Sequence, residues 1–257
     1  MPAHSPSRIP VILTAFGTQK DSQEVRDFLE ARFREAFPQC DFHWAFASRS
    51  VQQHRTSHTP PPPELILRQL ADAGHPCALI QSLHMVCAAE FHKLAALRRN
   101  APLRTGLGLP LLASVEDCHQ AALALDEAAQ LPEDTALVLA LHGSIHPGGA
   151  FFHLFGKIFM ETWGKRAFYG MIEGAPGKEE VARKVFEAGF TKAHILPFTL
   201  VKGRHFEEDL MGETNSWRKT FLAMGLTPDI PSRPMGLRPG IARIFCQHLE
   251  KALLSQI

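Results

Sequence analysis

Two stretches of the sequence decide the expected fold: VILTAFGT at residues 11–18 and LVLALHGS at residues 137–144. Each is a short apolar run that ends in a glycine and a hydroxyl residue, as expected for a buried strand entering a turn. They overlay at a shift of 126 residues, from 11 to 137. A second pair follows in the same order, with IQSLHMVCAAEF at 80–91 overlaying ILPFTLVKGRHF at 195–206. We interpret the two matches as an internal duplication, although βαβ units in general share such patterns.

The segments between these runs have helical periodicity. The first is expected to begin near Asp21, which has capping-box spacing to Glu24, and it carries apolar residues at Val25, Leu29 and Phe33. Further apolar runs lie at 42–47, 77–83, 106–112, 167–172 and 193–198, with helices expected between them, one of them over 116–130. Strands separated by helices need crossover connections, which favours parallel sheets covered on both faces. The sequence therefore predicts an α/β fold of two similar domains with an active-site cleft between them.

The duplication also sets the expected domain boundaries. We expect an N-terminal α/β domain over 1–130, joined by a C-terminal helix within 238–257, and a C-terminal α/β domain over 131–237. The carboxyl ends of parallel strands are where ligands bind in such folds. We therefore looked for polar residues at the ends of the apolar runs.

The composition narrows the classes of function. The formal net charge of +1 gives no reason to expect a nucleic-acid partner, and no stretch approaches the ~20 apolar residues of a membrane span. The five cysteines are scattered and form no CxxC pair, which argues against a disulfide framework and a structural zinc site. A reducing cytoplasm is the expected setting, and a homo-oligomer is left open. The 14 histidines favour metal or proton chemistry.

Four polar residues fall at equivalent strand ends. His142 and Glu173 end two apolar runs of the second half, His205 follows a third, and Glu90 occupies in the first half the place of His205. Each has an ordinary structural explanation, such as a turn histidine or a surface pair of Glu90 with Lys93. The functional interpretation explains all four together.

Two histidines and a carboxylate suit a borderline divalent metal such as Co²⁺, Fe²⁺, Ni²⁺ or Zn²⁺, and three protein ligands leave coordination positions open. Motifs of other protein classes are incomplete or absent. The GAPGK at 174–178 lacks the Walker A spacing of a nucleotide-binding P-loop. The glycines at 106 and 108 are not followed by the third glycine of a dinucleotide-binding motif, and the GxSxG of serine hydrolases is absent. His146 is a weaker ligand candidate than His142.

A family resemblance rests on several motifs: FGT at 16–18, QSLH at 81–84 leading to Glu90, HG at 142–143, the strand end at Glu173, LVKGRHFEEDL at 200–210 and NSW at 215–217. Over residues 9–255 the chain resembles the class II chelatases, and among them the anaerobic sirohydrochlorin cobaltochelatases of cobalamin synthesis. The resemblance implies an ATP-independent lyase that inserts a metal into a tetrapyrrole.

The resemblance also implies roles for residues. His142, Glu173 and His205 would bind the metal, and His142 and Glu90 would be catalytic in removing pyrrole protons. The residues expected to bind the tetrapyrrole are Gly17, Thr18, Ser82, Leu83, His84, Gly143, Ser144 and Lys202. Cations for its carboxylates are expected at Arg49, Lys93, Lys202 and Arg204.

The expected partners are the tetrapyrrole and a divalent metal. No cofactor is expected beyond the substrate metal, Co²⁺, with Fe²⁺ or Ni²⁺ as alternatives. Haem is not expected, because Cys87-Ala88-Ala89 stands where haem-binding relatives carry an extra histidine. Two other functions stay open: a ferrochelatase of sirohaem or haem synthesis, and a non-catalytic carrier of metal or tetrapyrrole.

Overall fold

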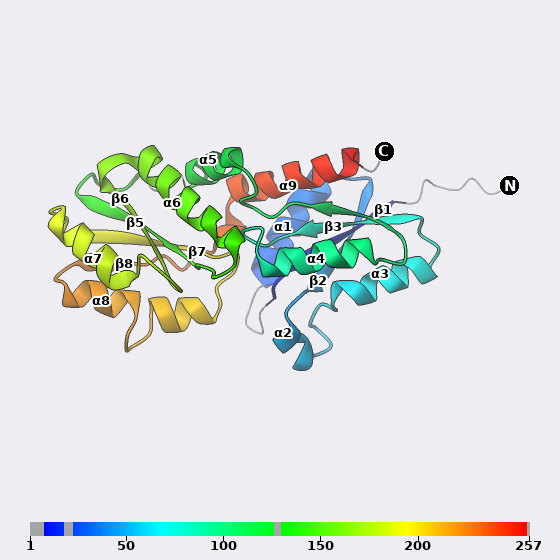
Figure 1. Ribbon diagram of the computed structural model, residues 1–257, viewed down its shortest axis with the longest axis horizontal. Helices are drawn as coiled ribbons and strands as arrows, with labels where there is room; N and C mark the ends of the chain where they lie inside the picture. The colour runs from blue at the N-terminus through cyan, green and yellow to red at the C-terminus, as the bar shows by residue number, and fades with distance from the viewer. Residues whose placement is uncertain (1–7, 18–22, 126–129, 256–257) are drawn as a thin grey trace. The chain divides into compact units, whose positions relative to one another are not determined.

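The chain folds around two separate four-stranded parallel sheets (Figure 1). The structure is a computed structural model that describes residues 8–17, 23–125 and 130–255. Two compact units divide the chain: unit 1 holds Met1–Gln19, Arg26–Leu111 and Ala242–Ile257, and unit 2 holds Lys20–Val25 and Leu112–Ile241. The predicted α/β architecture with two similar sheets flanked by helices is confirmed.

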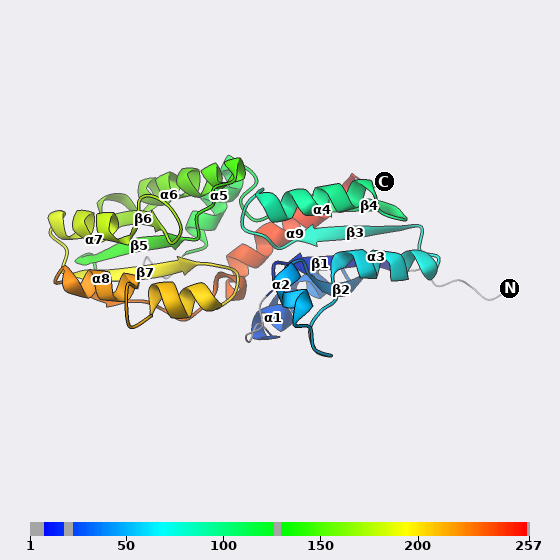
Figure 2. The same cartoon turned by 60° about the horizontal axis from the view of Figure 1, so that its bottom comes forward.

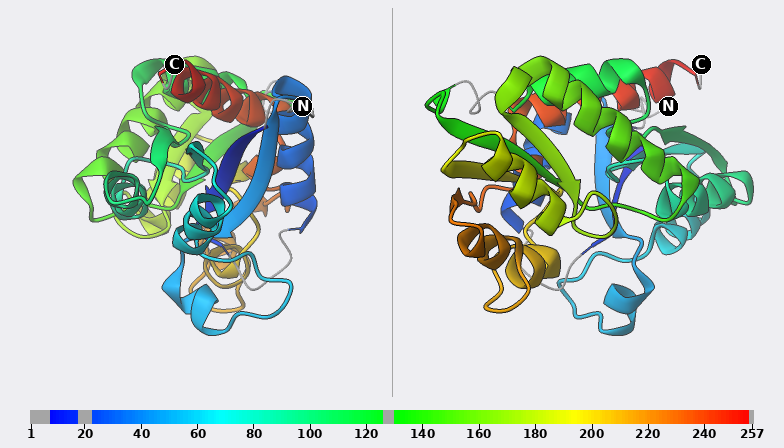
Figure 3. Two further views of the ribbon diagram at one scale, coloured as in Figure 1. Left: turned by 90° about the vertical axis from the view of Figure 1, so that its right-hand side faces the viewer. Right: turned by 60° about the vertical axis from the view of Figure 1, so that its left-hand side comes forward.

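Unit 1 contains a sheet of strand order β2-β1-β3-β4. Its strands are β1 (Ile9–Ala15), β2 (Cys40–Phe46), β3 (Cys77–Ser82) and β4 (Arg104–Gly108), and its helices are α1 (Gln23–Ala36), α2 (Arg49–Gln53), α3 (Pro63–Asp72), α4 (Ala89–Arg99) and α9 (Pro239–Leu254). Helices α3 and α4 pack Leu67, Leu70 and Leu94 against Ile12 and Ile80 of the sheet. Helices α1 and α9 lie on the opposite face (Figures 1 and 3).

Unit 2 contains a sheet of strand order β6-β5-β7-β8. Its strands are β5 (Thr135–Leu141), β6 (Ala167–Met171), β7 (Lys192–Phe198) and β8 (Thr227–Asp229). Its helices are α5 (Val115–Leu123), α6 (Ala150–Trp163), α7 (Lys178–Glu187) and α8 (Trp217–Ala223), with short helical turns η2 (Pro147–Gly149), η3 (Gly164–Arg166), η4 (Phe206–Leu210) and η5 (Met235–Leu237). All seven residues of β5 are buried, as a central parallel strand requires.

The helices of unit 2 cover both faces of its sheet (Figure 2). On one face α7 and α8 pack Val181, Val185 and Phe221 against Val138 and Ile195. On the other face α6 places Phe155 against Phe198 of β7, with 4.5 Å between the ring centroids. Buried on both sides, β5 and β7 hold the loops at their carboxyl ends in fixed positions.

The two sheets share not only their strand order but also their register. Ala15 pairs with Phe46 in unit 1, and the residues at the duplicated positions, Leu141 and Met171, pair in unit 2. Likewise Val11 pairs with Leu79, and Leu137 pairs with His194. Because a one-residue slip would turn every side chain to the other face, a matched register means that equivalent positions present equivalent side chains.

The structure moves several expected boundaries. The strand expected over 106–112 is β4, which ends at Gly108, two residues before Pro110, whose nitrogen has no hydrogen to donate to a ladder. The helix expected over 116–130 is α5, which ends at Leu123, while residues 126–129 lie outside the described residues, as does Asp21. No helix among the described residues is long and apolar enough to cross a membrane.

Candidate metal centre

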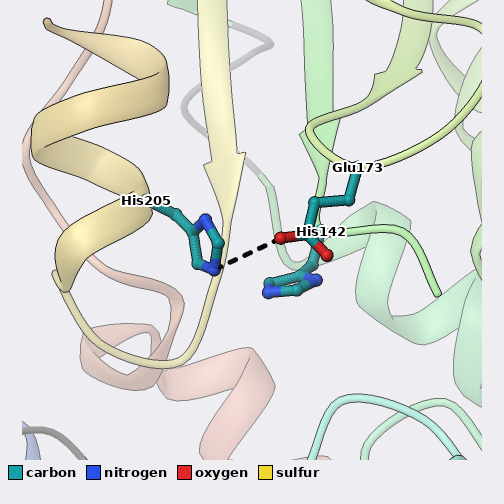
Figure 4. Close-up of side chains that lie close together, drawn as sticks. All are labelled: His142, Glu173 and His205. Carbon is teal, nitrogen blue, oxygen red and sulfur yellow. Dashed lines mark ion pairs between the residues drawn. The ribbon is translucent and has the colours of Figure 1, made fainter.

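Three side chains of unit 2 converge at the carboxyl ends of its strands (Figure 4). His142 follows β5, Glu173 follows β6, and His205 lies where the loop after β7 enters the helical turn η4 (Figure 4). Each offers one ligand atom, and the three atoms all lie within 4.8 Å of one another. The Nε2 atom of His205 is 4.0 Å from Oε1 of Glu173, and the two imidazole rings meet edge-on with centroids 4.5 Å apart.

The backbone fixes two of these candidate ligands, His142 and Glu173, relative to each other. The amide of Glu173 donates a hydrogen bond to the carbonyl of His142 at 2.8 Å, just beyond the last paired residues of β5 and β6. Gly143 follows with a φ of +86°, and a Cβ atom there would collide with the carbonyl oxygen of Glu173. Only glycine permits both this conformation and this close approach. The relative position of His142 and Glu173 therefore depends on Gly143.

Both histidines are held by their Nδ1 atoms. His142 Nδ1 lies 3.0 Å from the carbonyl oxygen of Gly143, and His205 Nδ1 lies 2.7 Å from Oδ2 of Asp209. Carbonyl and carboxylate oxygens only accept hydrogen bonds, so in each ring Nδ1 carries the hydrogen and donates it. The lone pair of each neutral imidazole is then on Nε2, which is the arrangement that metal-binding histidines use.

The spacing of the ligand atoms is wider than in a closed metal site. Ligand atoms around a tetrahedral ion with bonds of ~2.0–2.1 Å lie ~3.4 Å apart, so the atoms here must approach one another by about 1 Å. The Glu173 side chain is 61% exposed and can rotate to do so, whereas the histidines are braced. Three candidate ligands at the carboxyl ends of adjacent strands would leave coordination positions for water or for another ligand.

The loop that leads to His205 contains two positively charged side chains, Lys202 and Arg204. Lys202 Nζ lies over the ring of Phe206 at 4.7 Å from its centroid, and Phe206 itself is buried in the core of unit 2. Arg204 is exposed, and its Nε lies 3.9 Å from Oε2 of Glu208. Arg49 begins α2 in unit 1 and is exposed. Lys93 pairs with Glu90. Of these expected cations, Lys202 and Arg204 are on the same loop as a metal-ligand candidate.

Glu90 lies in unit 1, in the first turn of α4. Its Oε1 accepts a hydrogen bond from Lys93 Nζ at 2.6 Å, and its Oε2 is buried and meets no hydrogen-bond partner among the described residues. Nearby, Ser82 Oγ lies 3.0 Å from His84 Nδ1. Burial lowers the pKa of His84 to about 4, although the negative charge of Glu90 acts in the opposite direction. His84 is therefore neutral at neutral pH.

The other residues expected to bind the tetrapyrrole differ in how exposed they are. Gly17 has a φ of +95° at the end of β1, and Ser144 is exposed beside Gly143. Ser82 and Leu83 are buried, so their side chains contribute nothing to the surface, and the amide of Leu83 bonds to the carbonyl of Thr14. Their role in binding stays a prediction. Thr18 lies outside the described residues.

Asp209 is the residue of this centre that the sequence interpretation missed. It lies within the acidic run 207–209, which is typical of the solvent-exposed first turn of a helix. Its spacing of four residues from His205 was the available signal, because residues at i and i+4 share a helix face. The expected weaker candidate, His146, instead accepts a hydrogen bond from the amide of Gly148 at 3.0 Å.

Known proteins resemble this chain at both the sequence and the fold level. The family described as Cobalt chelatase (CbiK) matches residues 10–254. A sirohydrochlorin cobaltochelatase of Salmonella typhimurium is 31% identical over 196 residues, which cover 73% of this chain and 72% of that protein. SirB from Bacillus subtilis with Fe³⁺ superimposes with a TM-score of 0.69 at 17% identity, covering 97% of both chains. The sirohydrochlorin chelatase SirB from Bacillus subtilis subspecies spizizenii, in complex with cobalt, gives a TM-score of 0.62 at 12% identity over 95% of both chains.

Proposed function

Because the chain belongs to the cobalt chelatase (CbiK) family, we propose that it inserts Co²⁺ into sirohydrochlorin, or its reduced precursor, in the anaerobic cobalamin pathway. The observation that carries the proposal is the group of His142, Glu173 and His205, with both Nε2 lone pairs available. The relative from Salmonella typhimurium supports the choice of substrate.

The first task of the centre is to take the metal out of water. Two imidazole nitrogens and a carboxylate replace part of the hydration shell, and the remaining positions stay open toward the macrocycle. Since the ion is held by braced side chains, much of the entropic cost of bringing metal and ring together is met before insertion. The metal is a substrate here, so a site that binds it loosely enough to release it is the appropriate one.

The second task is to accept the pyrrole N–H protons. His142 and His205 each have one basic nitrogen, Nε2, and a nitrogen that coordinates a metal cannot accept a proton. Glu90 and metal-bound water are then the candidates, and we infer that Glu90 is the acceptor, because its Oε2 has no hydrogen bond to another described residue. We assign metal binding to His142, Glu173 and His205 and proton acceptance to Glu90.

The macrocycle itself is anionic, because it carries many peripheral carboxylates. Lys202 and Arg204 supply positive charge on the His205 loop. Backbone amides near Gly17, Gly143 and Ser144 are placed at strand ends, where they can donate to a carboxylate. Such contacts would orient the ring without adding a net positive charge to the whole chain.

The test is an insertion assay with purified protein, sirohydrochlorin and Co²⁺, followed by absorbance. His142→Ala and His205→Ala should each lower the insertion rate by about 100-fold or more, since loss of positioning alone costs that much. His119→Ala is the matched control, because His119 is an exposed histidine of α5 in the same unit. Wild-type rates in both ligand variants would refute the assignment.

The same assay separates the alternative functions. Turnover with Fe²⁺ and protoporphyrin alone would indicate a ferrochelatase, and binding without turnover would indicate a carrier. Metal choice is tested by competition between Co²⁺, Fe²⁺ and Ni²⁺ at equal concentrations, because a site of two histidines and a glutamate binds all three. We expect cobalt to be inserted in preference.

A further inference from the structure

An apolar groove lies at the amino ends of three strands of unit 1. Ile9, Cys77 and Arg104 are the first residues of β1, β3 and β4, and all three line the groove. Its volume is about 530 Å³. Ligands of parallel α/β sheets bind at the carboxyl ends of the strands, which are the opposite ends. The groove is therefore a surface that the proposed function leaves without a role.

Two helices on the same face of this sheet, α1 and α9, end at the groove (Figures 1 and 3). Their last residues, Ala36 and Leu254, both line it, and so does Phe37 directly after α1. Because both helices end here, they cover the start of the sheet only in part. Ile9 is half-buried, whereas Val11, two residues further along β1 on the same side of the strand, is fully buried.

The groove also has an exposed leucine on its own border. Leu254 lines the groove and is nevertheless 67% exposed. Single exposed aliphatic residues are common on protein surfaces, but this one lies beside an apolar depression of the same unit. In a dimer with a twofold axis, the same surface patch of both copies forms the contact. Leu254 of each copy could then fill the groove of the other.

The charges that line the groove are complementary to themselves in the same way. Arg104 and Glu250 are both exposed, and neither forms a hydrogen bond or an ion pair with another residue that the structure describes. A twofold axis through this surface would bring Arg104 of each copy toward Glu250 of the other, because residue pairs across such an axis occur twice. A partner of a single charge sign would instead meet one like charge. The charges therefore favour a second copy of this chain.

We propose that this groove is the contact surface of a homodimer, in which Leu254 of each copy packs into the groove of the other and Arg104 pairs with Glu250 across the axis. The inference is independent of the proposed function, because all of these residues belong to unit 1 and none is a candidate ligand of the metal. A specific interface buries ~800 Å² of each partner, so the contact extends from the groove over the ends of α1 and α9 around it. Few apolar groups take part, and the dimer is therefore expected to be weak, with a Kd in the micromolar range.

The experiment is sedimentation velocity of the full chain over a series of concentrations, from nanomolar to high micromolar. The wild type should change from monomer to dimer along the series. Leu254→Asp puts a charge into the apolar contact, and Arg104→Glu sets two like charges opposite each other, so each should raise the dimer Kd by roughly tenfold or more. The double variant Arg104→Glu with Glu250→Arg exchanges the two charges and should recover most of the wild-type affinity.

Leu123→Asp is the matched control, because Leu123 is also the last residue of a helix, α5 in unit 2, and is 65% exposed. It should dimerise like the wild type. A wild-type chain that stays monomeric throughout the series, or equal dimer affinities of Leu254→Asp and Leu123→Asp, would overturn the inference. A monomer that binds an apolar fluorescent probe, and loses this binding in Leu254→Asp, would also overturn it and would indicate a site for a small apolar ligand.

Discussion

His205 and Asp209 form a carboxylate–histidine pair, with 2.7 Å between Nδ1 and Oδ2. Asp209 lies in η4, four residues after the histidine. The pair orients the imidazole so that Nε2 points toward Glu173 (Figure 4). A carboxylate behind a histidine ligand also raises its basicity, and such partners contribute to metal affinity without touching the metal.

Removal of this partner should weaken the metal centre. We expect Asp209→Ala to reduce Co²⁺ affinity by roughly 10- to 100-fold, as for other partners of metal-binding histidines. Glu208→Ala is the control, since Glu208 is the neighbouring acid and lies 3.9 Å from Arg204 rather than beside a ligand. Titration calorimetry with Co²⁺ measures both. Equal affinities of the two variants would show that Asp209 does not position His205.

Replacement of Gly143 should be more harmful than replacement of Gly189, because a side chain at Gly143 would meet a steric clash in addition to the backbone strain. Gly143 and Gly189 both have a φ of +86°, but a Cβ at Gly143 would collide with the carbonyl of Glu173, whereas nothing lies within 4 Å of one at Gly189. Gly189→Ala should cost about 1 kcal/mol of unfolding free energy from backbone strain. Gly143→Ala should cost more and also impair Co²⁺ binding. Denaturant unfolding and metal titration test this, and similar losses in both variants would count against it.

Glu90 is expected to act on protons and not on the metal. Glu90→Gln removes the basic oxygens and should lower the rate of cobalt insertion by about 10²- to 10⁴-fold, the usual contribution of a general base. Its affinity for Co²⁺ in the absence of tetrapyrrole should not change. Glu64→Gln, at the equivalent first-turn position of α3, is the control. If Glu90→Gln lost Co²⁺ binding, Glu90 would belong to the metal site instead.

His84 predicts how stability depends on pH. Burial lowers its folded pKa to about 4 from an ordinary 6.5, with Glu90 opposing and Lys93 adding to the shift. As the pH falls below 6.5, His84 becomes protonated in the unfolded chain but stays neutral in the folded protein. The free energy of unfolding therefore decreases between pH 6.5 and 4. Between pH 7 and 5 this amounts to about 2 kcal/mol.

A variant isolates this contribution. His84→Gln keeps an acceptor for the Ser82 hydroxyl and removes the titrating group. Its unfolding free energy, measured by urea titration at several pH values, should therefore fall less steeply than that of the wild type as the pH is lowered. Parallel curves would show that His84 is not the group responsible.

Much of the fold could be read from local patterns. The runs at 11–18 and 137–144 predicted two strands, and their similarity predicted two similar halves, which the matched registers bear out. Element ends were less accurate, as β4 and α5 show. Strand and helix periodicity is a property of a few neighbouring residues, whereas an end depends on what the next segment packs against.

The sequence by itself determined the α/β class, the duplication and the placing of His142, Glu173 and His205 after three strands. Only the tertiary structure decided that these side chains meet, because residues 31 and 32 positions apart approach through the order β6-β5-β7 and its register. It alone also supplied Asp209 behind His205, the close approach at Gly143, the burial of His84 and the apolar groove beside Leu254. Distances across a sheet depend on strand pairing, which the spacing of residues along the chain does not encode.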